Sequence, residues 1–240
     1  MKKVLITTTI LALANLAMAS EGDDLTSLSY ISYLERYATV LPATQEEAIE
    51  AVLNMPLAAG DRVDTARECR MEVVLADGNT LWLDGYTSLS LDAVAFSRDV
   101  ESERTVLFLA DGSLMVEIAE HGLSGNPLRI DSRSATVYLS EAGLYRLQAL
   151  AAGGLRVEVR AGLAEAATVG GGVLVRAESA AEIAGGEVVR SEQVLSAQDD
   201  FSSWVDARRL IAAGVSGQHV DLRFSRQAAQ LDNYGSWVYV

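Results

Sequence analysis

The stretch from Pro56 to Asp92 constrains the fold more than any other, because apolar and polar residues alternate on both sides of a tight turn. A period of two is typical of a β-strand with one buried face. Asp77-Gly78-Asn79 separates the two runs, and glycine adopts the positive φ of such turns without steric cost. The segment therefore predicts a β-hairpin. Its alternating apolar positions are Met71, Val73 and Leu75 before the turn, and Leu81, Leu83, Leu89 and Leu91 after it.

Short alternating segments continue from Leu28 to about Val189, separated by turn residues at roughly 8 to 12 residues, the spacing of a sandwich, a barrel or a solenoid. The Asp77-Gly78 turn also has a weak echo at Asp111-Gly112, where a second hairpin is expected. One insert, Gln45 to Asn54, has a pattern compatible with a helix. We expect an all-β domain over residues 28–190, either a curled β-sandwich or a short β-solenoid.

The first nineteen residues have the three parts of a secretory signal peptide. Lys2-Lys3 gives a basic start, Val4 to Leu13 an apolar run, and Ala17-Met18-Ala19 a small-residue cleavage site. Cleavage is expected between Ala19 and Ser20, with the mature chain in the periplasm or outside the cell. No later segment reaches the 18 or so consecutive apolar residues of a transmembrane helix, so no membrane span is expected in the mature chain.

The charge of the chain indicates which partners it can bind, and its cysteine content indicates what stabilises the fold. Both lysines lie in the expected signal peptide, which leaves 17 arginines against 33 acidic residues. Binding to nucleic acid or to anionic lipid needs a basic surface, so neither is expected. The single cysteine, Cys69, forms no internal disulfide and is expected to be a small buried side chain, so stability must come from burial.

The composition changes at Asp199. Asp199 or Asp200 can cap a helix whose basic end holds Arg208-Arg209, and an extended aromatic tail follows to Val240. Residues 199–240 are therefore expected to form an appendage of one helix and a tail. The apolar face of the helix is expected to be Phe201, Trp204, Val205 and Ile211, and the candidate partner contacts are Trp204, Tyr234, Trp237 and Tyr239.

Motifs for catalysis and for metal binding are not found. His121 and His219 lie in separate regions, neither beside a serine in a nucleophile-elbow pattern, and no zinc-binding or calcium-loop spacing occurs. The glycines at 170–172 indicate a β turn, because no phosphate-loop lysine follows them. Trp82 alternates with Leu81 and Leu83 and therefore points to the opposite face of the strand. That face is either a second packed face or a binding surface. No catalytic residue, metal or cofactor is expected.

The stretch from Pro56 to Asp92 resembles the FecR domain, an all-β module of bacterial envelope proteins. The resemblance continues in the later half and into the segment after residue 199. The residues that carry it are Pro56-Leu57, Gly60-Asp61, Val63, Thr65, Asp77-Gly78, Leu81, Leu83, Thr87, Leu89, Arg129-Ile130-Asp131, Val137-Tyr138-Leu139, Gly143 and Tyr145-Arg146; Ser132-Arg133 departs from the usual Thr-Pro.

The FecR family relays an outer-membrane transport signal to a cytoplasmic sigma factor through a membrane span and a cytoplasmic segment. Neither part is expected here. The resemblance therefore implies a non-enzymatic interaction or signal-sensing module of the periplasm with an unidentified envelope protein as partner. A structural envelope scaffold and a hydrolase of envelope glycans stay open as alternatives, and the oligomeric state is left open.

Overall fold

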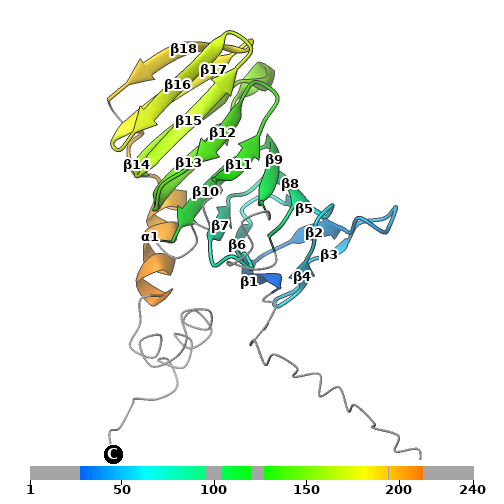
Figure 1. The fold of residues 1–240 in the computed structure, drawn as a ribbon. Coiled ribbons are helices and arrows are strands. Elements are labelled where there is room, and N and C mark those ends of the chain that lie inside the picture. The colour runs from blue at the N-terminus through cyan, green and yellow to red at the C-terminus, as the bar shows by residue number, and fades with distance from the viewer. Residues whose placement is uncertain (1–27, 96–103, 120–126, 194, 213–240) are drawn as a thin grey trace, which may run out of the picture.

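The computed structural model describes residues 28–95, 104–119, 127–193 and 195–212, and shows two nine-stranded β-sheets and one α-helix in these ranges (Figure 1). The expectation of an all-β fold is confirmed. A 3-10 turn lies at Ala151–Gly153. The strands are β1 (Ser29–Glu35), β2 (Ala38–Leu41), β3 (Ile49–Glu50), β4 (Pro56–Leu57), β5 (Arg62–Thr65), β6 (Arg70–Val74), β7 (Thr80–Leu83), β8 (Ser88–Ala93), β9 (Val106–Asp111), β10 (Ser113–Ile118), β11 (Leu128–Asp131), β12 (Thr136–Leu139), β13 (Gly143–Ala149), β14 (Leu155–Ala161), β15 (Leu163–Thr168), β16 (Gly171–Arg176), β17 (Ser179–Ala184) and β18 (Glu187–Glu192); the helix is α1 (Asp200–Ala212).

The two sheets form an open sandwich along which the chain advances steadily (Figure 1). The first, sheet A, has the order β18-β17-β14-β13-β10-β7-β6-β1-β4, and the second, sheet B, has the order β16-β15-β12-β11-β9-β8-β5-β2-β3. Neighbouring strands are antiparallel, except that β11 and β9 are parallel. After each one or two strands the chain crosses to the other sheet. Such corners therefore stack along the sides of the sandwich.

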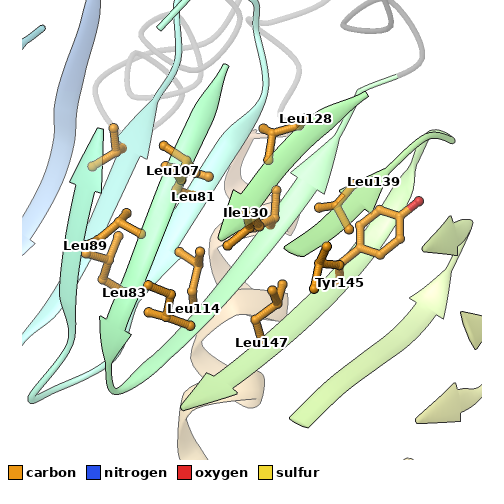
Figure 2. Close-up of a cluster of buried hydrophobic side chains, with 14 of the residues drawn as sticks. Leu81, Leu83, Leu89, Leu107, Leu114, Leu128, Ile130, Leu139, Tyr145 and Leu147 are labelled. Carbon is orange, nitrogen blue, oxygen red and sulfur yellow. The ribbon is translucent and has the colours of Figure 1, made fainter. Parts of the chain in front are cut away.

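The core lies between the sheets and consists of the inward half of each alternating strand (Figure 2). Leucines from sheet A meet leucines and isoleucine from sheet B, and each fully buried aliphatic side chain contributes about 1.5–3 kcal/mol. Free Cys69 is buried in this core, and burial raises the pKa of its thiol to about 11. Residues drawn in Figure 2 include Leu81, Leu83, Leu114 and Leu147 of sheet A, and Leu89, Leu107, Ile130 and Leu139 of sheet B.

Turn chemistry explains why the first hairpin forms where the sequence predicts it. β6 and β7 pair directly, and between them Gly78 has φ 87° while the Asn79 amide donates to Asp77 Oδ1 at 2.9 Å. The second Asp-Gly pair was expected to make a hairpin, and that expectation is wrong. Gly112 also has a positive φ, 88°, but it links β9 in sheet B to β10 in sheet A and is therefore a corner.

Gly112→Val is expected to destabilise the protein strongly. A Cβ at this position would lie 2.4 Å from both the Cα and the hydroxyl of Thr87, and valine is strained at positive φ. We expect a loss of at least about 3 kcal/mol in the free energy of unfolding, more than the roughly 1–3 kcal/mol expected for Gly78→Val. Urea denaturation of both variants measures the difference, and equal losses would contradict the crowded corner.

Two further sequence expectations meet the structure near β3. Gln45 to Asn54 is not helical: it contains the short strand β3, and the Ala51 amide donates to Ala38 O at 2.9 Å. The Gly60-Asp61 turn does form, with the Asp61 carboxylate accepting hydrogen bonds from the amides of Ala43 (2.9 Å) and Ala58 (2.8 Å).

Throughout the described ranges, no helix has the length and apolar character needed to cross a membrane.

Candidate partner-binding surface

Three corners stack on one side of the sandwich: those joining β1 to β2, β5 to β6 and β7 to β8. The Ala66 amide donates to Tyr37 O (3.0 Å), and the Tyr86 amide donates to Ala66 O (3.4 Å). Each corner contains a non-glycine residue at positive φ, namely Arg36, Glu68 and Tyr86. Such conformations cost roughly 1–3 kcal/mol each and concentrate at functional sites, so these corners are candidates for a site.

Buried hydroxyl groups fix these corners relative to one another. Thr65 Oγ1 donates to Asp84 O (2.6 Å) and accepts from the Thr87 amide (2.8 Å). Thr87 Oγ1 in turn donates to Ser113 O and accepts from the Ser113 amide, both at 3.1 Å. Thr65 and Thr87 thus connect successive corners, which makes the exposed surface above them preorganised.

A shallow groove of about 660 Å³ lies over the three corners. Its aromatic side chains are Tyr86, which is 66% exposed, and Trp204 from α1. The charged side chains are paired: Arg36 and Arg67 lie 3.6 and 3.5 Å from Glu68. The groove is lined by Glu35, Arg36, Arg67, Glu68, Arg70, Asp84, Gly85, Tyr86 and Trp204.

Asp84 and Arg70 form the floor of the groove and are paired with each other. Burial raises the pKa of Asp84, although the Gly85 amide and Arg70 act in the opposite direction. A tyrosine and a tryptophan among paired charges of both signs match the composition of a protein-binding surface, where tyrosine, tryptophan and arginine are enriched.

Helix α1 packs on the outer face of sheet A and supplies one wall of the groove. Asp199 caps it: the Ser202 amide donates to Asp199 Oδ1 (2.8 Å), and the Asp199 amide donates to Ser202 Oγ (2.9 Å). The helix buries Phe201 and Val205 in a second apolar cluster, and Trp204 packs against its rim. From sheet A that cluster includes Trp82, Met115 and Leu144.

A buried carboxylate anchors the other end of the helix. Glu72 of β6 is 1% exposed and accepts hydrogen bonds from Ser32 Oγ (2.7 Å) and Trp82 Nε1 (2.8 Å). Arg208 of α1 also binds this carboxylate, with Nε 3.0 Å and Nη2 3.3 Å from its two oxygens. The guanidinium also lies 4.4 Å from the ring centroid of Tyr33, a cation–π distance.

Two more ion pairs extend the contact along α1. Arg209 lies 2.9 Å from Glu117 of β10, and Arg146 of β13 lies 2.7 Å from Asp199. Burial alone raises the pKa of Asp199, but hydrogen bonds from Arg146 and Ser202 outweigh it and hold that pKa at about 2. The helix therefore rests on sheet A through an apolar centre with ion pairs around it.

The depressed pKa of Asp199 predicts an acid-dependent docking of α1. Its ordinary value is 3.8, so the stabilisation is complete above about pH 4 and is lost as pH falls towards about 2. Because Asp199 is partly exposed, we expect Asp199→Asn, which keeps the cap, to cost only about 0.5–1 kcal/mol at pH 6. The difference in free energy of unfolding between the parent and Asp199→Asn, measured by urea denaturation, should decrease from pH 5 to pH 2. A gap independent of pH would contradict the assignment.

The structure brings one predicted partner contact, Trp204, to the groove. Ile211 was expected on the apolar face of the helix, and that expectation is wrong: it is 45% exposed, and Arg208 reaches the sheet instead. Trp82 belongs to a second packed face, since α1 covers it. The other candidate contacts (Tyr234, Trp237, Tyr239), the expected cleavage residues (Ala19, Ser20) and both histidines (His121, His219) lie outside the described residues.

Sequence reasoning missed Glu72, Arg208 and the groove. A usable signal exists for Glu72, because it stands directly opposite Trp82 across β6 and β7, on the face turned away from the core. A carboxylate beside a tryptophan there indicates a covering element. Among the described residues, no group of three or more His, Cys, Asp or Glu side chains is placed to hold a metal ion.

Residues 61–165 match the family model described as FecR protein. No curated protein matches the chain. Two crystal structures, at 2.50 Å and 1.65 Å resolution, are similar in part, and each is described as that of a "putative anti-sigma factor" from Parabacteroides distasonis ATCC 8503. Their sequence identities are 17% and 15%, and both have a TM-score of 0.47. Each likeness covers 55% of this chain and 59% of the other, less than two thirds of those chains.

The matched range contains most of the features described above. It begins at the Asp61 turn, includes the corners at Glu68 and Tyr86 and the buried Glu72, and ends in β15. Helix α1 lies outside it and packs against it. Residues 61–165 of this chain are thus similar to the FecR domain.

Proposed function

We propose that this chain is a non-enzymatic interaction or signal-sensing module of the bacterial cell envelope, and that it binds a protein partner in the groove between the stacked corners and α1. The FecR match over residues 61–165 is the observation that carries the proposal. The Lys2-Lys3 start and the Ala17-Met18-Ala19 site support export to the periplasm or beyond.

The groove supports a protein partner for three reasons. It combines an exposed tyrosine with a tryptophan, the residues that most often supply binding energy at protein interfaces. Its corners are fixed by Thr65 and Thr87, which lowers the entropy lost on binding. Its strained corner residues, such as Tyr86, point to a use beyond folding.

Hydrolysis of an envelope glycan is the second candidate, because the groove places Asp84 and Glu68 beside two aromatic rings. The pairing of both carboxylates with arginines favours the binding function. A general acid or base must face the substrate, whereas both of these carboxylates are engaged in ion pairs, Asp84 with Arg70 and Glu68 with Arg36. Asp84→Asn is a direct check: the purified chain should release no sugar from peptidoglycan, and release that Asp84→Asn abolishes would establish the hydrolase.

Site-specific photo-crosslinking tests the proposal. A photoreactive phenylalanine analogue is placed at Tyr86 in the groove and, as a matched control, at Val169, a fully exposed residue in the turn between β15 and β16. Irradiation of cells expressing each variant should link position 86, but not position 169, to one envelope protein. Identical products from the two positions, or no product from position 86, would overturn the groove as the binding surface.

A further inference from the structure

Helix α1 has an apolar contact of its own, separate from the core between the sheets. Phe201 and Val205 pack on Trp82, Met115 and Leu144, which lie on the outer face of sheet A. The core lies on the opposite face of that sheet, and within the described residues it shares no side chain with the helix contact. Lifting α1 away from sheet A would therefore leave the core of the sandwich complete.

Ion pairs make up much of the remaining contact between α1 and sheet A. Arg208 binds the buried Glu72, and Arg209 pairs with Glu117. Burying an ion pair removes both charges from water, and that cost offsets much of their attraction. When the helix lifts, Glu72 and Arg208 both regain water. The ion pairs thus define where α1 docks, while the small apolar cluster supplies most of the free energy that holds it there.

The segment before α1 permits such a movement. Residues 195–199 join the helix to the sandwich and, in the described part of the chain, pair with no strand. The start of this linker is attached, because the Ser196 amide donates to Glu158 Oε1 at 3.1 Å. A helix of this length is marginal in water on its own, so α1 should lose its helical structure when it lifts. Docking and helix formation then become one step.

We propose that α1 is a latch, which opens as one unit from sheet A while the sandwich stays folded, and that the groove is complete only while the latch is closed. Trp204, one of the two aromatic residues of the groove, belongs to α1, and the other lining residues belong to the sandwich. Opening therefore removes one wall of the groove and leaves the three corners in place.

The consequence of the latch for a partner rests on the proposed function. A partner that contacts Trp204 binds the closed state only, so its apparent affinity is reduced in proportion to the closed fraction. The opening itself does not depend on the groove or on a partner.

Native-state hydrogen exchange of the full chain, followed by mass spectrometry, tests the latch. The slowest amides of α1 should have at least about tenfold lower protection than those of β9 and β12 in sheet B. Amides of α1 exchange when the latch opens, whereas those strand amides need the sandwich to unfold. Low concentrations of urea should hardly change α1 exchange, because opening exposes little surface. Equal protection with equal urea dependence would overturn the proposal, and so would an α1 without protection.

Two matched variants distinguish a latch from a single cooperative fold. Ile130 lies in the core between the sheets, so Ile130→Val should speed exchange in β9 and β12 by about three- to tenfold and leave α1 exchange unchanged. Val205→Ala weakens the helix contact and should speed α1 exchange by about tenfold. If Ile130→Val speeds exchange equally in α1 and in the strands, the helix and the sandwich open together and the latch is excluded.

Thiol labelling gives an independent readout. Cys69 is buried in the core between the sheets and reports unfolding of the sandwich, whereas a thiol introduced by Met115→Cys lies beneath α1 and reports the latch. An aromatic disulfide reagent should label the introduced thiol at least about tenfold faster than Cys69, and Ile130→Val should raise only the Cys69 rate. A single rate for both thiols would contradict the latch. Neither readout involves a partner, so each can fail independently of crosslinking at position 86.

Discussion

Replacing Phe201 by alanine is expected to lower the free energy of unfolding by about 3–5 kcal/mol, the usual cost of truncating a buried aromatic residue. Phe201 is buried at the centre of the contact between α1 and sheet A, against Trp82 and Leu144. The guanidinium carbons of Arg70 and Arg146 also lie 5.3 and 5.6 Å from its ring centroid, and they lose that contact in the variant. Urea denaturation followed by tryptophan fluorescence measures the loss.

Leu210→Ala is the matched control for Phe201→Ala. Leu210 lies on the same helix but is 77% exposed, so its truncation should change stability by less than about 0.5 kcal/mol. A small effect at both positions would mean that α1 does not rest on sheet A in solution.

Arg208→Leu is the second change with a large expected effect, about 3–5 kcal/mol. It removes the cation that neutralises Glu72, a carboxylate that α1 and its neighbours exclude from water. The Ser32 and Trp82 hydrogen bonds remain, but they do not balance the charge. Thermal melts of the parent and of Arg208→Leu at pH 7 measure the effect.

Arg209→Leu provides the comparison for Arg208→Leu. The Arg209–Glu117 distance is 2.9 Å, close to the 3.0 Å between Arg208 and Glu72. Because both side chains of the Arg209–Glu117 pair reach solvent, the free energy of unfolding is expected to fall by less than about 1 kcal/mol. If the two arginine variants melt alike, burial of Glu72 is not what makes the Arg208 pair important.

The strand pattern of the core could be predicted from the sequence because its causes are local. Alternation fixes which residues face inward, and Gly78 needs only its own positive φ to set the β6–β7 turn. Gly112 shows the limit of local information. The same Asp-Gly pair makes a corner there, because what decides between hairpin and corner is the sheet to which the following strand pairs.

The contact of α1 with sheet A could not be predicted in detail, since it joins residues far apart in sequence. Glu72 and Arg208 are 136 positions apart, and nothing in either local pattern names the other. Helical periodicity placed Ile211 on the covered face, but the buried carboxylate beneath the helix selects Arg208 for that place. The helix expected at Gln45 to Asn54 does not form for a related reason. Ile49 pairs with Val40 of β2, which is distant in sequence, and an isolated ten-residue helix is marginal in water.

The most direct test of the partner-binding surface uses the envelope protein captured at position 86 and measures its affinity for Trp204→Ala. Trp204 lines the groove and is only partly buried, so the variant should fold, as circular dichroism can verify. The Kd is expected to rise by about tenfold or more in Trp204→Ala, whereas Leu210→Ala on the same helix should leave it unchanged. Equal affinity of parent and Trp204→Ala for that partner would contradict the groove as its binding site.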